Sequence, residues 1–197
     1  MRTAPFPAAD VGGPGGAGPI DVSFFSRPSS TVNTPRSNKR IPAPSQSHTG
    51  GGMTPVAVNP SSLPAPSGYS HGTLSGNTLY LGGQTALDAD MRIVPGGIVE
   101  QFRQAFGNVL TTLREVGGRP EDLVSITLYL TDIPDYQAHG REIGKVWREL
   151  AGPVYPAMAG IGCTALWQPE AMIEILGVAV VPDERLVRPA VPGQAGA

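Results

Sequence analysis

Hydrophobic side chains recur at two different spacings along the chain, and each spacing predicts one kind of element. Residues 98–116 carry apolar side chains three or four positions apart, which predicts an amphipathic helix. Gly117 and Gly118 should end this helix, because glycine is common just beyond the last helical residue. Residues 135–150 show the same spacing and predict a second helix, with Gly152 beyond its end.

Alternation of apolar and polar side chains predicts a sheet beside these helices. The expected strands are residues 69–75, 78–81, 122–130, 156–166 and 171–181. The dipeptide Gly76-Asn77 suits a two-residue turn, so the first two strands should form a hairpin. From Val124 to Leu130, apolar residues alternate with a mixed set, which predicts one apolar face. The order β-β-α-β-α-β-β predicts an α+β fold with two helices on one face of the sheet, and the uncovered face favours an oligomer.

Glycine and proline divide the chain into three parts. The 197 residues include 26 glycines and 21 prolines, a content that excludes a long helical bundle or coiled coil. Residues 1–58 are rich in glycine, proline and serine and poor in apolar residues, so we expect a disordered tail there. Residues 59–183 should form the domain, and residues 184–197 should form a loose C-terminal end.

Charge and motif content exclude several functional classes. Residues 59–197 carry nine Lys and Arg against fourteen Asp and Glu, a net charge of −5 that disfavours binding to nucleic acid. No apolar run reaches transmembrane length and no secretory signal is present, so we expect a cytoplasmic protein without a membrane partner. The chain lacks phosphate-binding and dinucleotide motifs and any metal-ligand spacing, so we expect neither a cofactor nor a metal. Its one cysteine, Cys163, is expected to act as a small buried hydrophobe.

Glu174 is the candidate catalytic residue. It stands in the last predicted strand among apolar neighbours, and burying an unpaired carboxylate is unfavourable. Two interpretations follow. Glu174 is either a structural carboxylate that is paired within the fold or an interface, or it lines a cleft where a raised pKa suits it to proton transfer.

Small residues elsewhere in the sheet favour a binding site. Ala159 and Gly160 belong to a strand of small side chains, which admits either close backbone packing or a ligand. The segment Gly82-Gly83-Gln84 forms either a plain bulge or a loop whose N–H groups hold an oxyanion. Tyr69 and His71, two residues apart on a strand, face the same side and form a candidate pocket wall.

Together these segments resemble the Rid family (YjgF-type, reactive intermediate deaminase). The likeness spans residues 59–183, and its motifs occur in the family's order: Tyr69-Ser70-His71, Leu79 to Gln84, Glu100-Gln101 leading to Asn108, Val124 to Asp132, Tyr155-Pro156-Ala157 and Ile173-Glu174-Ile175. The resemblance implies a chorismate-mutase-like homotrimer with three clefts between its subunits. In the deaminase members, an enamine or imine is hydrolysed in such a cleft to a 2-oxo acid and ammonia.

The resemblance also implies roles for individual residues. Glu174 matches the family's water-orienting glutamate and Tyr69 matches the tyrosine of the cleft, so both are expected to be catalytic. The expected substrate-binding residues are His71, Gly82, Gly83, Gln84, Met158, Ala159 and Gly160.

Three positions depart from the family's pattern. Met158 replaces the arginine that holds the substrate carboxylate, Gly82 replaces a serine, and Leu176 replaces a second glutamate. Methionine cannot form a bidentate ion pair with a carboxylate. The chain is therefore similar to arginine-lacking subgroups of the family.

Three functions remain to be compared. The first is a Rid-like hydrolase or deaminase that acts on a small imine, enamine or carbonyl compound, with Glu174 orienting water or transferring a proton. The second is a non-catalytic small-molecule-binding or regulatory trimer, in which Met158 has abolished deaminase activity and the N-terminal tail engages a partner enzyme. The third is RNA cleavage, an older label for the wider family, which the negative charge of the domain disfavours.

Overall fold

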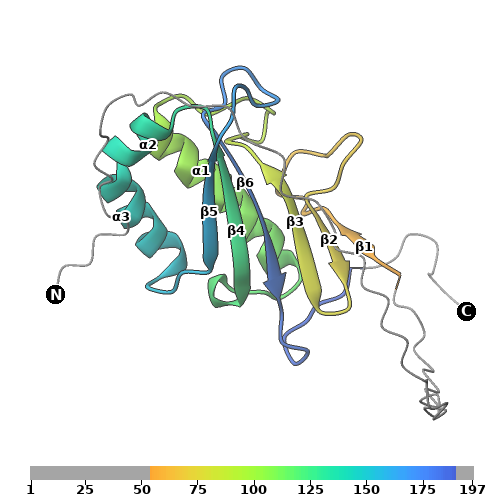
Figure 1. Ribbon diagram of the computed structural model, residues 1–197. Helices are drawn as coiled ribbons and strands as arrows, with labels where there is room; N and C mark the ends of the chain where they lie inside the picture. Colours follow the sequence, from red (N-terminus) through yellow and green to blue (C-terminus); the bar gives the residue numbers. More distant parts are fainter. Residues whose placement is uncertain (1–53, 190–197) are drawn as a thin grey trace, which may run out of the picture. The chain divides into compact units, whose positions relative to one another are not determined.

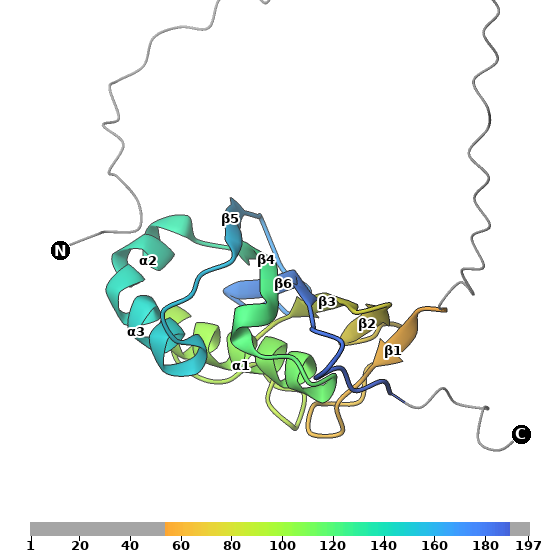
Figure 2. The ribbon, with the colours of Figure 1, turned by 90° about the horizontal axis from the view of Figure 1, so that it is seen from below.

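The structure of the protein is a computed structural model, and it describes residues 54–189. A mixed sheet of six strands has the order β1-β2-β3-β6-β4-β5, and the α-helices lie on one of its faces (Figures 1 and 2). The elements in chain order are β1 (Val56–Val58), β2 (Gly72–Ser75), β3 (Thr78–Gln84), α1 (Ile98–Glu115), the 3-10 turn η1 (Pro120–Asp122), β4 (Leu123–Leu130), α2 (Ile133–Ala138), α3 (Gly140–Ala151), β5 (Ala157–Gly162) and β6 (Ile173–Val180). The predicted α+β fold with its helices on one face is confirmed.

The β2-β3 hairpin turns at Gly76 and Asn77, as the sequence predicts. Gly76 has a φ of 64°, whereas the φ of Asn77 is not positive. A positive φ at the first central position is the requirement of a type II′ turn, which glycine meets without strain.

The ordered sheet begins before the predicted domain boundary at residue 59. β1 pairs antiparallel with β2, with Val56 opposite Leu74, and Val58 is fully buried. These valines have a partner strand and a core to pack against, which the glycine- and proline-rich composition around them does not reveal. The rest of the predicted tail, residues 1–53, and the predicted loose end from residue 190 lie outside the described residues.

α1 packs an apolar stripe on the sheet and ends at a glycine pair. The Gly118 N–H donates to the Leu113 carbonyl at 3.0 Å, and the Gly117 N–H donates to the Arg114 carbonyl at 2.9 Å. These two bonds are those of a Schellman motif, and Gly117 has the left-handed φ of 78° that the motif requires. The predicted end of this helix is confirmed.

The second predicted helix, over residues 135–150, is two helices. The Asp132 side chain accepts a hydrogen bond from the Asp135 N–H at 2.9 Å, so α2 begins at a cap before the predicted start. His139 then leaves the helical conformation, and Gly140, a poor helix former, follows it. The prediction of one helix was wrong because apolar spacing continues across the break. Among the described helices, none is both long and apolar enough to cross a bilayer.

β4 begins with a bulge that the simple alternation did not predict. Val124 was expected on the apolar face, yet it is 52% exposed and Leu123 is 6% exposed. The pairing of β4 with β6 shifts register between Leu123 and Ser125, and such a bulge re-aims the side chains that precede it. From Ile126 to Leu130 the predicted alternation is confirmed.

β6 is a central strand, and its successive side chains alternate between the covered and the open face of the sheet. Ile173 and Ile175 are fully buried under the helices. Glu174 and Leu176 point to the opposite face, where they are partly exposed. β5 at the edge is exposed along its whole length and ends at Gly162, before its predicted end.

The segment after β6 folds back onto the domain, beyond the predicted end of the domain. Arg185 donates to both carboxylate oxygens of Asp122, at 2.6 and 2.8 Å, and the Val187 N–H donates to the Val116 carbonyl at 3.0 Å. Burial alone would raise the pKa of Asp122. The hydrogen bonds from Arg185 and the Arg119 N–H, together with the charges of both arginines, outweigh burial and lower the pKa below its ordinary value.

Replacing Arg185 by Met should lower the thermal unfolding midpoint at pH 7, because Asp122 would remain largely buried without its partner. The folded state holds the pKa of Asp122 below its ordinary value of 3.8, so the ionised pair stabilises the fold above that pH. Protonation removes this contribution as the pH falls through the folded-state pKa. The difference in midpoint between wild type and Arg185→Met, measured by circular dichroism, should therefore shrink at acid pH.

Arg188→Met is the matched control, since Arg188 is exposed and donates to the Gly76 carbonyl rather than to a carboxylate. It should change the midpoint little at any pH. Equal losses in both variants across the whole pH range would contradict the role given to Arg185.

Candidate functional site

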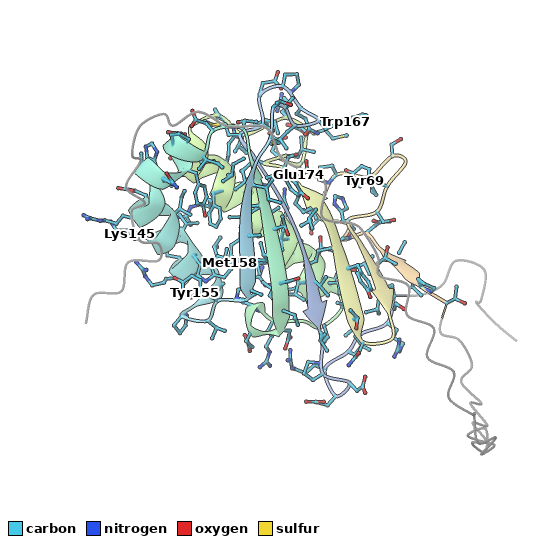
Figure 3. All side chains as sticks on the ribbon, viewed as in Figure 1. Tyr69, Lys145, Tyr155, Met158, Trp167 and Glu174 are labelled. Carbon is cyan, nitrogen blue, oxygen red and sulfur yellow. The ribbon has the colours of Figure 1, made fainter. Side chains whose placement is uncertain are left out.

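Glu174 lies near the start of β6, on the face of the sheet that the helices leave open (Figure 3). Its partner across the ladder on β4 is Tyr129, and Gly83 of β3 lies on its other side. Partial burial raises the pKa of Glu174, and no hydrogen bond or charge within residues 54–189 offsets that rise. A carboxylate in this state can both accept and return a proton.

The Glu174 carboxylate packs directly on the backbone of Gly83. A Cβ at position 83 would lie 1.8 Å from Oε1 and 2.8 Å from Cδ of Glu174. The position of the carboxylate and the lack of a side chain at Gly83 therefore depend on each other.

Gly82 and Gly83 form a β-bulge, because the pairing of β3 with β6 shifts register at this point. The Gly82 N–H donates to the His71 carbonyl at 2.9 Å. A Cβ at position 82 would lie 2.6 Å from the Ser70 carbonyl oxygen. A serine at this position would thus require the neighbouring backbone to move.

His71 and Gln84 lie beneath the bulge, with 3% and 4% of their surfaces exposed. His71 Nε2 donates to the Pro64 carbonyl at 2.8 Å, and its Nδ1 lies 3.2 Å from Gln84 Oε1. Gln84 Nε2 donates to the Gly82 carbonyl at 3.3 Å. These contacts use both side chains to hold the bulge. His71 was expected to form a pocket wall with Tyr69, but its side chain is buried beneath the bulge.

Tyr69 covers the outer side of His71. The two rings meet edge to face with their centroids 5.6 Å apart, and Tyr69 remains 46% exposed. Tyr69 precedes β2 rather than belonging to the strand, and it lies at the same end of the sheet as Glu174 (Figure 3).

The structure does not bring Met158 and Glu174 together within one chain. Met158 is opposite Ile126, which is buried under the helices, whereas Glu174 is opposite Tyr129 on the open face. Their partners on β4, Ile126 and Tyr129, are three residues apart, which is about 10 Å at the rise of a strand. Figure 3 shows Met158 beside Tyr155, away from Glu174.

Ala159 and Gly160, like Glu174 and Met158, lie on opposite faces of the sheet. Ala159 is opposite Thr127, on the open face, and Gly160 is opposite the buried Leu128. Both are exposed at the edge of the sheet. Ala159 is thus the predicted β5 residue that shares a face with Glu174.

Tyr129 is a neighbour of Glu174 that the sequence did not identify, and Ile161 lies one strand further away, beside Tyr129. Tyr129 is directly opposite Glu174 on β4, and Ile161 is opposite Tyr129 on β5. Alternation along β4 assigns Tyr129 to the mixed face, but the residue it meets on β6 depends on strand register. In the part of the chain that the structure describes, no group of three His, Cys, Asp or Glu side chains could hold a metal ion.

A sequence profile of the family described as endoribonuclease L-PSP matches residues 60–181. The match includes the bulge, Tyr69 and Glu174 and omits β1. The chain belongs to this family. Its members are also called Rid or YjgF proteins.

Named relatives of this Rid protein include deaminases. The 2-iminobutanoate/2-iminopropanoate deaminase of Capra hircus is 32% identical over 127 residues, which cover 64% of this chain and 83% of the goat protein. Protein mmf2, mitochondrial, of Schizosaccharomyces pombe is 34% identical over 105 residues, which cover 53% of this chain and 79% of that protein.

Solved Rid structures share the fold. The YjgF gene product of E. coli superposes with a TM-score of 0.58 at 25% identity, covering 64% of this chain and 98% of the other. Yeast Mmf1 gives a TM-score of 0.56 at 26% identity, with the same coverage of 64% and 98%.

Gly83→Ala should displace the Glu174 carboxylate without unfolding the Rid domain, because the clashing atoms end a flexible side chain. The displaced carboxylate would be more solvated, so the pKa of Glu174 should fall toward its ordinary value of 4.5. An NMR titration of the Glu174 carboxyl carbon and a crystal structure of the variant measure both effects.

Gly107→Ala in α1 is the matched control, since no atom lies within 4 Å of a Cβ at position 107. It should leave the pKa of Glu174 unchanged and stabilise the helix by roughly 0.5–1 kcal/mol. If Gly83→Ala leaves both the pKa and the position of Glu174 unchanged, the close packing described above is incorrect.

Proposed function

We propose that this Rid-family protein is a hydrolase that deaminates a small imine or the enamine in equilibrium with it, with Glu174 and Tyr69 as catalytic residues. The observation that carries the proposal is the Glu174 carboxylate, which lies on the open face of the sheet with a pKa raised by burial. The goat relative is named as a 2-iminobutanoate/2-iminopropanoate deaminase, an activity of the same reaction class.

The proposed reaction converts R2C=NH and water into R2C=O and NH3. Glu174 accepts a proton from water as the water oxygen bonds to the imine carbon; the C=N electron pair moves to nitrogen, and Glu174 returns the proton to that nitrogen to give a carbinolamine. Glu174 then takes the hydroxyl proton of the carbinolamine and delivers it to the nitrogen as the C–N bond breaks, so the products are the C=O compound and NH3. A raised pKa suits Glu174 to this exchange, since proton transfer is most efficient when the pKa of the group is near the working pH.

A second chain completes the site in this proposal. One chain holds Met158 and Glu174 on opposite faces of its sheet, so they can approach one substrate only from two different chains. The open face also exposes apolar side chains, among them Tyr80 and Val180. Exposed apolar area of this kind is typical of a subunit interface. A homotrimer with three clefts between subunits would cover this area.

We propose that the chain is one of the family's arginine-lacking members, because Met158 stands where the arginine is expected. Its thioether cannot pair with a substrate carboxylate, so a less charged, more apolar imine or carbonyl compound is the expected substrate. The same residue supports the alternative, a trimer that binds small molecules without turning them over.

The remaining parts of the proposal concern partners and location. The reaction above requires no cofactor, and the net charge of −5 over residues 59–197 disfavours RNA as a substrate. We retain the cytoplasm as the proposed location, although mmf2 is named as mitochondrial. We also retain a partner enzyme as the proposed contact of the N-terminal tail.

Glu174→Gln should lower the rate of ammonia release from freshly generated 2-aminoacrylate by about 10²- to 10⁴-fold, the usual contribution of a general acid–base group. Glutamine preserves the shape of the side chain but cannot accept the proton. Formation of ammonia and oxo product above the uncatalysed rate is the measurement, repeated with a neutral cyclic imine.

Glu115→Gln, an exposed change at the end of α1, is the control and should retain wild-type activity. Wild-type kcat/KM should fall as the pH drops through the pKa of Glu174, above its ordinary 4.5, because the protonated acid is no longer a base. Equal rates for wild type and Glu174→Gln on both substrates would favour the non-catalytic binding protein.

Light scattering should find a particle of about three times the chain mass of 20.5 kDa. Val180→Arg places a charge on the open face and should reduce this mass, whereas Val187→Arg changes an exposed valine after β6 and should not. An active monomer would contradict a site built from two chains.

A further inference from the structure

Trp167 is the most exposed large hydrophobic side chain in the described residues, with 91% of its surface accessible. The other tryptophan, Trp147, is 3% exposed and stacks between Phe106 and Tyr155 in the core. An indole exposed to water gives no hydrophobic stabilisation, and contact with a bound ring would bury its surface favourably. Trp167 is therefore the side chain that gains most from being covered.

The loop between β5 and β6 holds Trp167 in a defined place. Gln101 of α1, which is 3% exposed, donates to the Glu170 carbonyl at 3.0 Å and accepts from the Met172 N–H at 2.8 Å. These two buried hydrogen bonds hold the loop backbone at Glu170 and at Met172. The indole therefore projects from an anchored turn.

A second anchor connects this loop to the Glu174 site. Thr85 Oγ1 donates to Gln168 Oε1 at 3.0 Å, and Gln168 is the residue after Trp167. Thr85 lies two positions beyond Gly83, on which the Glu174 carboxylate packs. This short path of contacts brings Trp167 to the same end of the sheet as Glu174, as Figure 3 shows.

Tyr69 is also connected to the end of the sheet that holds Glu174, through a different set of contacts. It packs on His71, which contacts Gln84 at the end of the bulge. In Figure 3, Tyr69, Glu174 and Trp167 all lie at this end of the sheet, and each of the two aromatic rings is substantially exposed.

We propose that Trp167 determines specificity at the Glu174 site by stacking on a planar aromatic group of the substrate, so that the protein prefers aromatic imines to aliphatic ones. This inference rests on the proposed imine hydrolysis. Met158 provides no charge to hold a substrate, so apolar contact has to supply the binding free energy. A stacked pair of aromatic rings commonly contributes about a tenfold change in affinity.

Two imines with the same carboxylate test the proposal, one generated from phenylalanine and one from leucine by an amino-acid oxidase. Wild type should have the higher kcat/KM for the phenylalanine imine. Trp167→Ala should lower that value about tenfold and change the leucine value less than about twofold. Trp167→Phe should restore most of the preference, because phenylalanine keeps an aromatic face.

Calorimetric titration with the two oxo products, phenylpyruvate and 4-methyl-2-oxopentanoate, gives a readout that needs no turnover. Wild type and Glu174→Gln should both bind phenylpyruvate more tightly, and Trp167→Ala should lose the preference. If no imine is hydrolysed but the preference depends on Trp167, the hydrolase proposal fails and the specificity role stands.

Val187→Ala, an exposed valine beside the C-terminal end of α1, is the control and should alter neither ratio. Equal effects of Trp167→Ala on both imines, or no effect on either, would overturn the specificity role and leave the hydrolase intact. A smaller particle mass for Trp167→Ala would also overturn it, because the indole would then be covered by a second copy of the chain.

Discussion

The sheet buries one face against α1, α2 and α3 and leaves the other face open, and this asymmetry decides where a reactive side chain can lie. β6 places Ile173 and Ile175 in the core, so alternation turns Glu174 to the open face. On the covered face the carboxylate would be unpaired among hydrocarbon side chains, at a large cost in free energy. On the open face its burial is partial, and the pKa is raised while the group stays accessible.

The glycines beside Glu174 are explained by close packing rather than by backbone flexibility. Neither Gly82 nor Gly83 has a positive φ, yet a Cβ on either would collide, one with a backbone carbonyl and the other with the carboxylate. His71 and Gln84 hold the same bulge from the buried side. The carboxylate, the backbone beside it and the support beneath it therefore form one packed unit.

In the proposed function, proton transfer and substrate recognition belong to different parts of the fold. Glu174 is on a central strand whose position is set by the core, whereas Trp167 is on a loop and Met158 is on the exposed edge strand β5. Loops and edges can change without disturbing the core. An altered substrate class, as proposed above for a site with Met158 and Glu174, is thus compatible with an unchanged fold.

The sequence by itself determined α1 and its Schellman end, the turn at Gly76 and the two faces of β6, because each depends on spacing within one short segment. The tertiary structure decided what depends on partners distant in the chain. The bulge at Val124 and the face on which Met158 lies follow from strand register, since a shift of one residue reverses every side chain. The burial of His71 follows from its contacts with Pro64 and Gln84, which are distant in the chain. Local pattern identifies a strand and its faces, but register is set by packing against another strand, so the neighbours of Glu174 became known only from the folded chain.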